Sequence, residues 1–143
     1  MSILHLPGLD QDSAAISPCG QYRYALTRGW GPDPRAIFIM LNPSTADASI
    51  DDPTIRRCKA FAREWHCGAL TVVNLYAWRA TSPAELKTPG RNVVGPDNDD
   101  AIRTAVTAAA RKGWPVVAAW GANAKADRTA EVARIVERSG VLL

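Results

Sequence analysis

The chain has 143 residues, of which 47% are hydrophobic and 22% are charged. These proportions fit one globular domain with an ordinary core, and they exclude a disordered or fibrous chain. The formal net charge of +3 is small, and the lysines and arginines are scattered along the chain. The charge therefore gives little support for nucleic acid as a partner.

The sequence also bears on location and cofactors. No stretch approaches the roughly 20 apolar residues that a membrane helix needs, and residues 1–10 lack a secretory signal, which predicts a cytoplasmic protein without a membrane partner. Cys19, Cys58 and Cys67 are odd in number and form no C-x-x-C pair, so we expect reduced thiols. His66 beside Cys67 has no second ligand pair. We predict no cofactor and no metal site, with magnesium at Asp47 as the one alternative.

The first half of the chain predicts two strands and a helix. Residues 22–28 (YRYALTR) alternate like an exposed or edge strand, and residues 36–41 (AIFIML) are a continuous apolar run, typical of a strand covered on both faces. A helix should run from Pro53 to near Gly68, because Asp52 can cap its free amides and proline suits the first helical position. Its apolar face comprises Ile55, Cys58, Phe61, Ala62 and Trp65.

The second half continues this alternation. Residues 69–75 (ALTVVNL) predict a buried strand, and a long polar loop follows, in which Ser82 and Pro83 can start a helical turn. The remaining predicted elements are a helix from Asp97 or Asn98 to about Arg111, a buried strand at 115–120 (PVVAAW), a helix ended by Gly140, and the beginning of another strand at 141–143 (VLL).

Strands that alternate with helices predict an α/β fold. We expect one domain over residues 1–143, built as a three-layer α/β/α sandwich around a mostly parallel central sheet. In open parallel sheets the ligand crevice lies beyond the carboxyl ends of the strands. Asn42 follows the first buried strand, Asn74 ends the second, and Gly121 and Asn123 follow the third. We therefore expect these three segments to meet around one site.

The loop after the first buried strand carries the candidate catalytic residues. Asn42 precedes a proline, and its amide could orient a water or read a base edge, or could only close the turn. Ser44 and Thr45 could bind phosphate or serve as turn hydroxyls. Asp47 has no evident local role and could act as a base or hold magnesium through water. Asp52 is most simply the helix cap.

The other two loops supply candidate substrate-binding residues. Asn74 ends its strand much as Asn42 does, and Arg79 could grip phosphate or carboxylate with two hydrogen bonds, or form a surface ion pair. Tyr76, Trp78 and Trp120 could stack on a base or cap the core. Gly121 and Asn123 lie in a loop that could admit a ligand close to the backbone.

Four segments together resemble one family, namely FIMLNPSTADASIDDPTIRRCKAFAREW, VVNLYAWRATSPAEL, VGPDND and VVAAWGAN. In this order, over roughly residues 21–140, they are similar to the bacterial domain-of-unknown-function family 1643. The resemblance implies no activity. The family pattern continues with a strand, a Lys-Asp-Gly segment and a His-Pro-Leu segment, so we expect this chain to be truncated at its C-terminal end relative to that pattern.

A more distant similarity concerns IMLNPS alone. It is similar to the Gly-Ile-Asn-Pro-Gly loop of mismatch-specific uracil-DNA glycosylases, in which the Asn helps to position the hydrolytic water on an α/β sheet of comparable layout. Met40 and Ser44 replace the two glycines here. The resemblance therefore implies a uracil-DNA glycosylase-like fold and a role for Asn42 only.

Two functional hypotheses follow. The first is a glycosylase-like hydrolase that acts on a nucleobase, nucleotide or nucleic acid, in which Asn42 and Asp47 are catalytic. The second is a noncatalytic module that binds a small ligand such as a nucleobase or nucleotide through the same loops. The sequence does not indicate whether the chain is a monomer or an oligomer.

Overall fold

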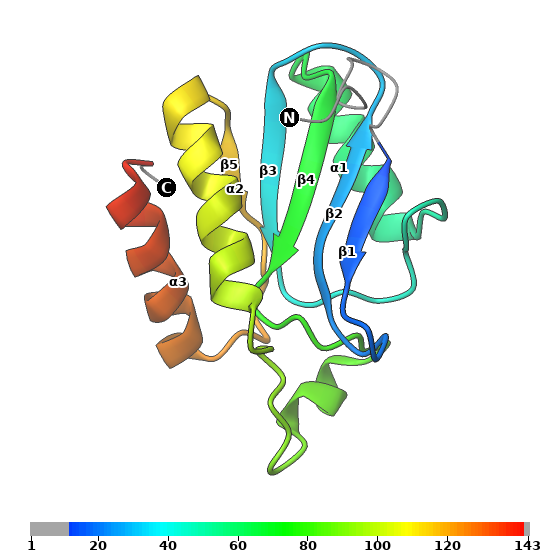
Figure 1. Cartoon of the computed structure of the whole chain (residues 1–143), viewed down its shortest axis with the longest axis vertical. Coiled ribbons are helices and arrows are strands. Elements are labelled where there is room, and N and C mark those ends of the chain that lie inside the picture. Colours follow the sequence, from blue (N-terminus) through cyan, green and yellow to red (C-terminus); the bar gives the residue numbers. More distant parts are fainter. Residues whose placement is uncertain (1–11, 142–143) are drawn as a thin grey trace.

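The computed structural model describes residues 12–141, in which one sheet carries helices on both faces (Figure 1). In this range the strands are β1 (Ser13–Ile16), β2 (Arg23–Gly29), β3 (Arg35–Met40), β4 (Ala69–Asn74) and β5 (Val116–Ala118). The helices are α1 (Pro53–Glu64), α2 (Asn98–Lys112) and α3 (Ala126–Ser139), with the short 3-10 helix η1 (Pro83–Lys87). None of these helices combines the length and the apolar character that crossing a membrane requires.

The sheet is mixed, with strand order β1-β2-β4-β3-β5. β3 pairs in parallel with β4 and with β5, whereas β2 is antiparallel to both β4 and β1. The expectation of a mostly parallel sheet is therefore wrong. No helix connects β2 to β3, so the chain reverses direction through the loop 30–34. Because β4 is parallel to β3, β2 is antiparallel to its neighbour β4.

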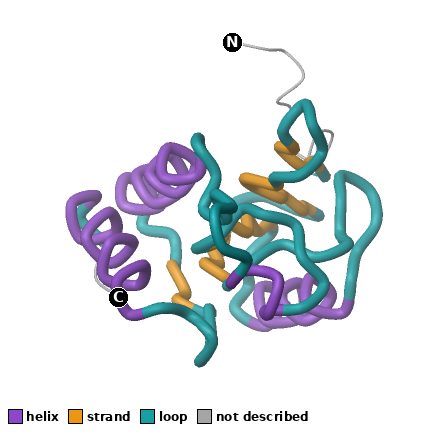
Figure 2. The backbone as a smooth tube through the Cα atoms, turned by 90° about the horizontal axis from the view of Figure 1, so that it is seen from below, coloured by secondary structure: helices purple, strands orange, loops and turns teal. Residues whose placement is uncertain are grey.

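Two apolar clusters hold the helices to the sheet. On one face, Phe38, Leu70 and Val72 pack with Ile55 and other residues of α1. On the other face, Ile39 and Val73 pack with residues of α2 and α3. Figure 2 shows the helices on both sides of the strands. This arrangement leaves the carboxyl ends of β3 and β4 side by side, because Met40 is in register with Asn74.

The starts of α1 and η1 follow the sequence signals closely. The Asp52 side chain accepts a hydrogen bond of 2.9 Å from the backbone N–H of Ile55, and Pro53 is the first residue of α1. Ser82 and Glu85 form a capping box at η1. Both starts are confirmed because they depend on local chemistry that the neighbouring elements do not change.

Other boundaries differ from the predictions. α1 ends at Glu64 rather than near Gly68, since His66 takes a positive φ of 61° that stops the helix. β1 was not predicted at all. β5 is only three residues long and is not fully buried, because it lies at the edge of the sheet and pairs with β3 alone. Of the strand expected at residues 141–143, positions 142 and 143 lie outside the described residues.

Candidate functional site

A cavity of about 370 Å³ lies where β3 and β4 end, beside the first turn of α1. Two of the three expected segments meet there, because Asn42, Ser44 and Asn74 all line it. The third segment, at Gly121 and Asn123, does not line the cavity, but Ala119 and Trp120 just before it do. The rest of the wall consists of Arg23, Met40, Leu41, Asp52, Thr54, Ile55, Val72, Ala80, Thr81 and Pro83. The hollow is thus polar on one part of its wall and apolar on another.

Asn74 is the most unusual residue of this wall. It is 0% exposed, yet neither its side-chain oxygen nor its side-chain nitrogen has a hydrogen-bond partner. Its backbone is held firmly, since the Asn98 side chain donates to the carbonyls of Asn74 (2.9 Å) and Leu75 (3.1 Å). Buried polar groups in proteins are nearly always paired, and an unpaired one costs about 1–3 kcal/mol. The amide of Asn74 therefore lacks a partner within the described chain, and an ordered water or a ligand in the cavity would supply one.

Arg23 is the second polar group with unused capacity. Only 2% of the residue is exposed, and its Nη1 donates to the carbonyl of Ala46 at 2.9 Å, whereas its Nε has no partner. Burial lowers the pKa of Arg23 to about 10, against the opposing effect of the Asp52 charge. The side chain stays protonated at neutral pH and presents a desolvated cation to the cavity.

Asn42 has a structural role as well as a place in the wall. Its Nδ2 donates to the carbonyl of Pro43 at 2.9 Å and to the carbonyl of Ala80 at 3.0 Å. The amide therefore closes its own turn and ties that turn to the loop after β4. These two bonds use the side-chain nitrogen, which leaves the oxygen Oδ1 for a ligand or a water.

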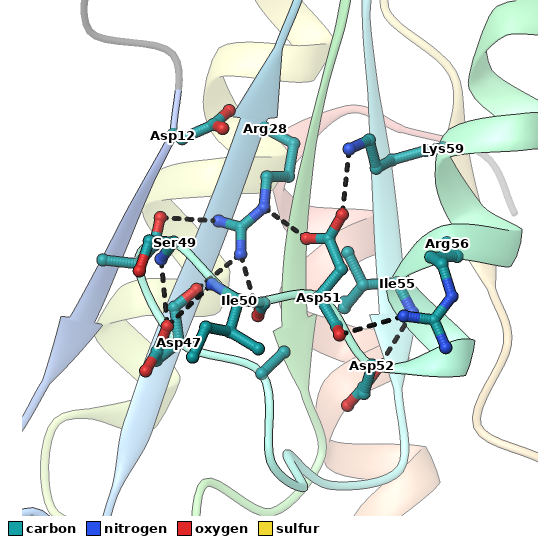
Figure 3. Close-up of polar contacts among 12 residues, drawn as sticks. Asp12, Arg28, Asp47, Ser49, Ile50, Asp51, Asp52, Ile55, Arg56 and Lys59 are labelled. Atoms are coloured by element: carbon teal, nitrogen blue, oxygen red, sulfur yellow. Dashed lines mark hydrogen bonds and ion pairs between the residues drawn. The ribbon is translucent and has the colours of Figure 1, made fainter.

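Arg28 fixes the loop between β3 and α1 (Figure 3). Its guanidinium donates to Asp51 Oδ1 at 2.7 Å and to the carbonyls of Ala48 (3.2 Å) and Ile50 (3.3 Å), with a further bond to the carbonyl of Asp47. One buried side chain thus satisfies several carbonyls of a loop that has no regular structure of its own. This loop carries both Ser44 and Asp52 to the cavity.

Asp47 has a local role that the sequence did not reveal. Its Oδ1 accepts hydrogen bonds from the backbone N–H groups of Ser49 (2.9 Å) and Ile50 (2.8 Å). These bonds stabilise the carboxylate and lower its pKa, which makes it a weaker base. Asp47 is not among the residues that line the cavity. The expectation that it has no local role is wrong, and its catalytic role stays a prediction.

The neighbouring carboxylates are also occupied. Burial acts to raise the pKa of Asp51, but hydrogen bonds from Lys59 and Arg28 outweigh burial and lower it. The bond from Lys59 Nζ reaches Asp51 Oδ2 at 2.9 Å. Asp52 caps α1 as predicted, is 8% exposed, and also lines the cavity.

The other predicted site residues do not line the cavity, and their roles stay predictions. The Tyr76 hydroxyl accepts a bond from the N–H of Lys125 at 3.3 Å, and the Trp78 ring lies under the guanidinium of Arg91. Arg79 donates to the carbonyl of Gly20 at 3.3 Å. Thr45, Gly121 and Asn123 are exposed.

Sequence reasoning missed both buried arginines of this region. Arg28 lies two residues after the fully buried Leu26 in the alternation of β2, so the pattern itself indicates that its side chain points to a covered face. No comparable signal marks Arg23. Its burial depends on the loop 42–46 and on the segment after β4, which only the folded chain brings against it.

No curated protein and no solved structure matches the chain. One family model does, the one described as "Protein of unknown function (DUF1643)", over residues 23–142. This range spans the cavity and all its walls, and Arg23 is its first residue. The chain therefore belongs to the DUF1643 family of proteins of unknown function.

Proposed function

We propose that the chain binds a small polar ligand of the nucleobase or nucleotide class in the strand-end cavity. The single observation that carries the proposal is the amide of Asn74, which is fully buried at the cavity wall with a donor and an acceptor both unpaired. A carboxamide pairs with a neighbouring donor and acceptor on one edge of its partner, and nucleobases offer such edges.

The size and the lining of the cavity support the same class. A volume of about 370 Å³ falls in the range of small-molecule pockets, and most of these pockets combine apolar walls with a few polar groups. Met40, Val72 and Trp120 supply apolar contacts, and Asn42 and Asn74 supply directional ones. A flat heterocycle with polar edges can make both the apolar contacts and the directional hydrogen bonds.

The test is a thermal-shift screen of nucleobases, nucleosides and nucleotides, with and without magnesium. We expect a member of these classes to raise the melting temperature of the unaltered protein. The Asn74→Ala variant should lose most of that shift, whereas Gln21→Ala, which removes an exposed carboxamide outside the cavity, should keep it. If a compound raises the melting temperature of Asn74→Ala as much as that of the unaltered protein, the ligand does not bind at Asn74.

A second candidate is hydrolysis of a glycosidic bond, on a three-layer fold of the uracil-DNA glycosylase type. The observation that favours it is the position of Asn42 and Asp52 on the wall of one cavity. An amide oxygen could orient a water there, and a carboxylate could stabilise the positive charge that develops on the sugar as the base departs. Asp47 enters this candidate only as an auxiliary group, and nucleic acid as substrate stays a prediction.

Turnover separates the two candidates. If the chain is a hydrolase, incubation with nucleosides or nucleotides releases free base, which chromatography detects. Asn42→Ala should then reduce release far more than it reduces binding, and Asp47→Asn tests the predicted base. A ligand that binds without any release of free base supports the binding function and contradicts the hydrolase.

A further inference from the structure

Arg23 is a desolvated cation whose hydrogen-bonding capacity the protein does not fill. One nitrogen donates to the carbonyl of Ala46, which is neutral, and Nε donates to nothing although the residue is 2% exposed. Buried arginines are normally paired with a carboxylate or another anion. Within residues 12–141, none of the ion pairs involves Arg23.

Asp51 and Asp52 of the loop before α1 form no ion pair with Arg23, although the charge of Asp52 acts on it. Asp51 is paired with Arg28 and Lys59, at 2.7 Å and 2.9 Å. Asp52 lines the same cavity, but its Oδ1 caps α1 by accepting from Ile55, and it forms no ion pair with Arg23 in the described chain. The charge of Arg23 is therefore only partly balanced.

Neutral groups around the cavity suit an anion as well. Ser44 and Thr54 line it, and the hydroxyl of each is able to donate to an anionic oxygen. Thr54 lies in the first turn of α1, a helix of 12 residues whose N-terminal end carries partial positive charge. The unpaired, fully buried amide of Asn74 on the same wall points independently to a ligand.

We infer that Arg23 anchors an anionic oxygen group of the ligand, with Ser44 and Thr54 as additional donors, so that the cavity takes a phosphate- or carboxylate-bearing molecule rather than a neutral one. This inference rests on the proposed function and narrows it, because among nucleobase compounds it selects the nucleotide over the nucleoside. In this arrangement the amide of Asn74 forms hydrogen bonds with the polar edge of the base, and Arg23 binds the anionic group.

The experiment compares matched probes by calorimetric titration at constant ionic strength, since exposed charges also attract anions weakly. The probes are a nucleoside, its 5′-monophosphate, inorganic phosphate and acetate. The last two distinguish phosphate from carboxylate without any base attached. The variants are Arg23→Gln, and Arg103→Gln as a control that removes a positive charge from the exposed Arg103–Asp100 pair on α2.

We expect the monophosphate to bind the unaltered protein at least about tenfold more tightly than the nucleoside, a ratio that a charge-assisted contact readily provides. Arg23→Gln should bring that ratio close to one, and Arg103→Gln should leave it unchanged. Because the ratio is first measured on the unaltered protein, the inference stays testable even if Arg23→Gln fails to fold.

Failure of this inference differs from failure of the proposed function. If nucleoside and monophosphate bind equally, the anion anchor is wrong and the proposed function stands. If phosphate or acetate binds in an Arg23-dependent manner while no nucleobase compound does, the anchor stands and the proposed ligand class is wrong. A flat response to every probe contradicts both.

Discussion

Arg28 on β2 and Asp51 in the loop before α1 form an ion pair, with Nε 2.7 Å from Oδ1, and the arginine side chain is only 1% exposed. The same guanidinium bonds to the carbonyls of Ala48 and Ile50. The pair therefore joins the sheet to a loop that lacks regular hydrogen bonding. Whatever the cavity binds, the position of its loop wall depends on this contact.

The first prediction concerns Arg28. Arg28→Leu should lower the free energy of unfolding by about 3–5 kcal/mol, because it leaves several loop carbonyls without their donor and Asp51 with Lys59 as its remaining partner. Urea unfolding followed by circular dichroism measures the change. The control Arg103→Leu breaks an exposed pair and should cost less than about 1 kcal/mol. Equal losses in the two variants would show that the loop does not depend on Arg28.

The second prediction concerns acid stability. The pKa of Asp51 in the folded chain lies below its ordinary value of 3.8, so its ion pairs contribute fully above that value and are lost as the pH falls through the lowered folded value. Asp51→Asn should therefore destabilise the protein most near neutral pH, and its difference from the unaltered protein should shrink below about pH 4.

Urea unfolding at about pH 7 and about pH 3 measures this difference. Asp100→Asn is the matched control, because the Asp100 side chain is 81% exposed and its ion pair lies on the surface. A difference between Asp51→Asn and the unaltered protein that stays constant over the acid range would mean that the Asp51 pKa is not lowered on folding.

The third prediction concerns the close approach of two loops. A Cβ atom on Gly68 would lie 1.9 Å from the carbonyl oxygen of Pro32, which is backbone and cannot swing aside. Gly68→Ala should therefore destabilise the protein by about 1–3 kcal/mol or more, as overpacking does. Gly31→Ala is the control, since its Cβ would meet an ordinary contact of 3.7 Å. Calorimetric melting temperatures of the two variants should differ clearly, and similar values would contradict the packing seen here.

Local signals in the sequence predicted the features that depend on local chemistry. Asp52, Pro53 and Ser82 start their helices as expected, since a cap acts on the next three amides whatever surrounds it. The prediction that the segments beginning at Asn42 and Asn74 meet also holds, because β3 and β4 are parallel neighbours.

The remaining features depend on contacts between distant segments, which periodicity does not encode. The short loop between β2 and β3 reverses the chain, but the place of β2 beside β4 depends on a distant pairing, and an alternating pattern is the same for either strand direction. Arg23 is buried by the loop that contains Ala46, more than 20 residues away in the chain. β5 ends at Ala118 rather than at the predicted residue 120. Ala119 and Trp120 therefore line the cavity in place of Gly121 and Asn123.

The last prediction separates binding from stability at Asn74. Both polar atoms of this fully buried side chain are unpaired within the chain, so their desolvation is offset only by what enters the cavity, a ligand or an ordered water. Asn74→Leu replaces the amide by an apolar group of similar size. We expect it to raise the free energy of unfolding of the free protein by about 1–2 kcal/mol and to abolish the ligand-induced thermal shift.

The contrasting variant is Asn98→Leu. Asn98 is equally buried and its side-chain oxygen is also unpaired, but its side-chain nitrogen donates to the carbonyls of Asn74 and Leu75, so its replacement should destabilise the free protein. Chemical unfolding of both variants without ligand gives the comparison. Residues kept for binding often lower stability. If the free energy of unfolding rises in Asn74→Leu and falls in Asn98→Leu, Asn74 serves the ligand and Asn98 serves the fold. A loss of stability in both would mean that Asn74 also serves the fold.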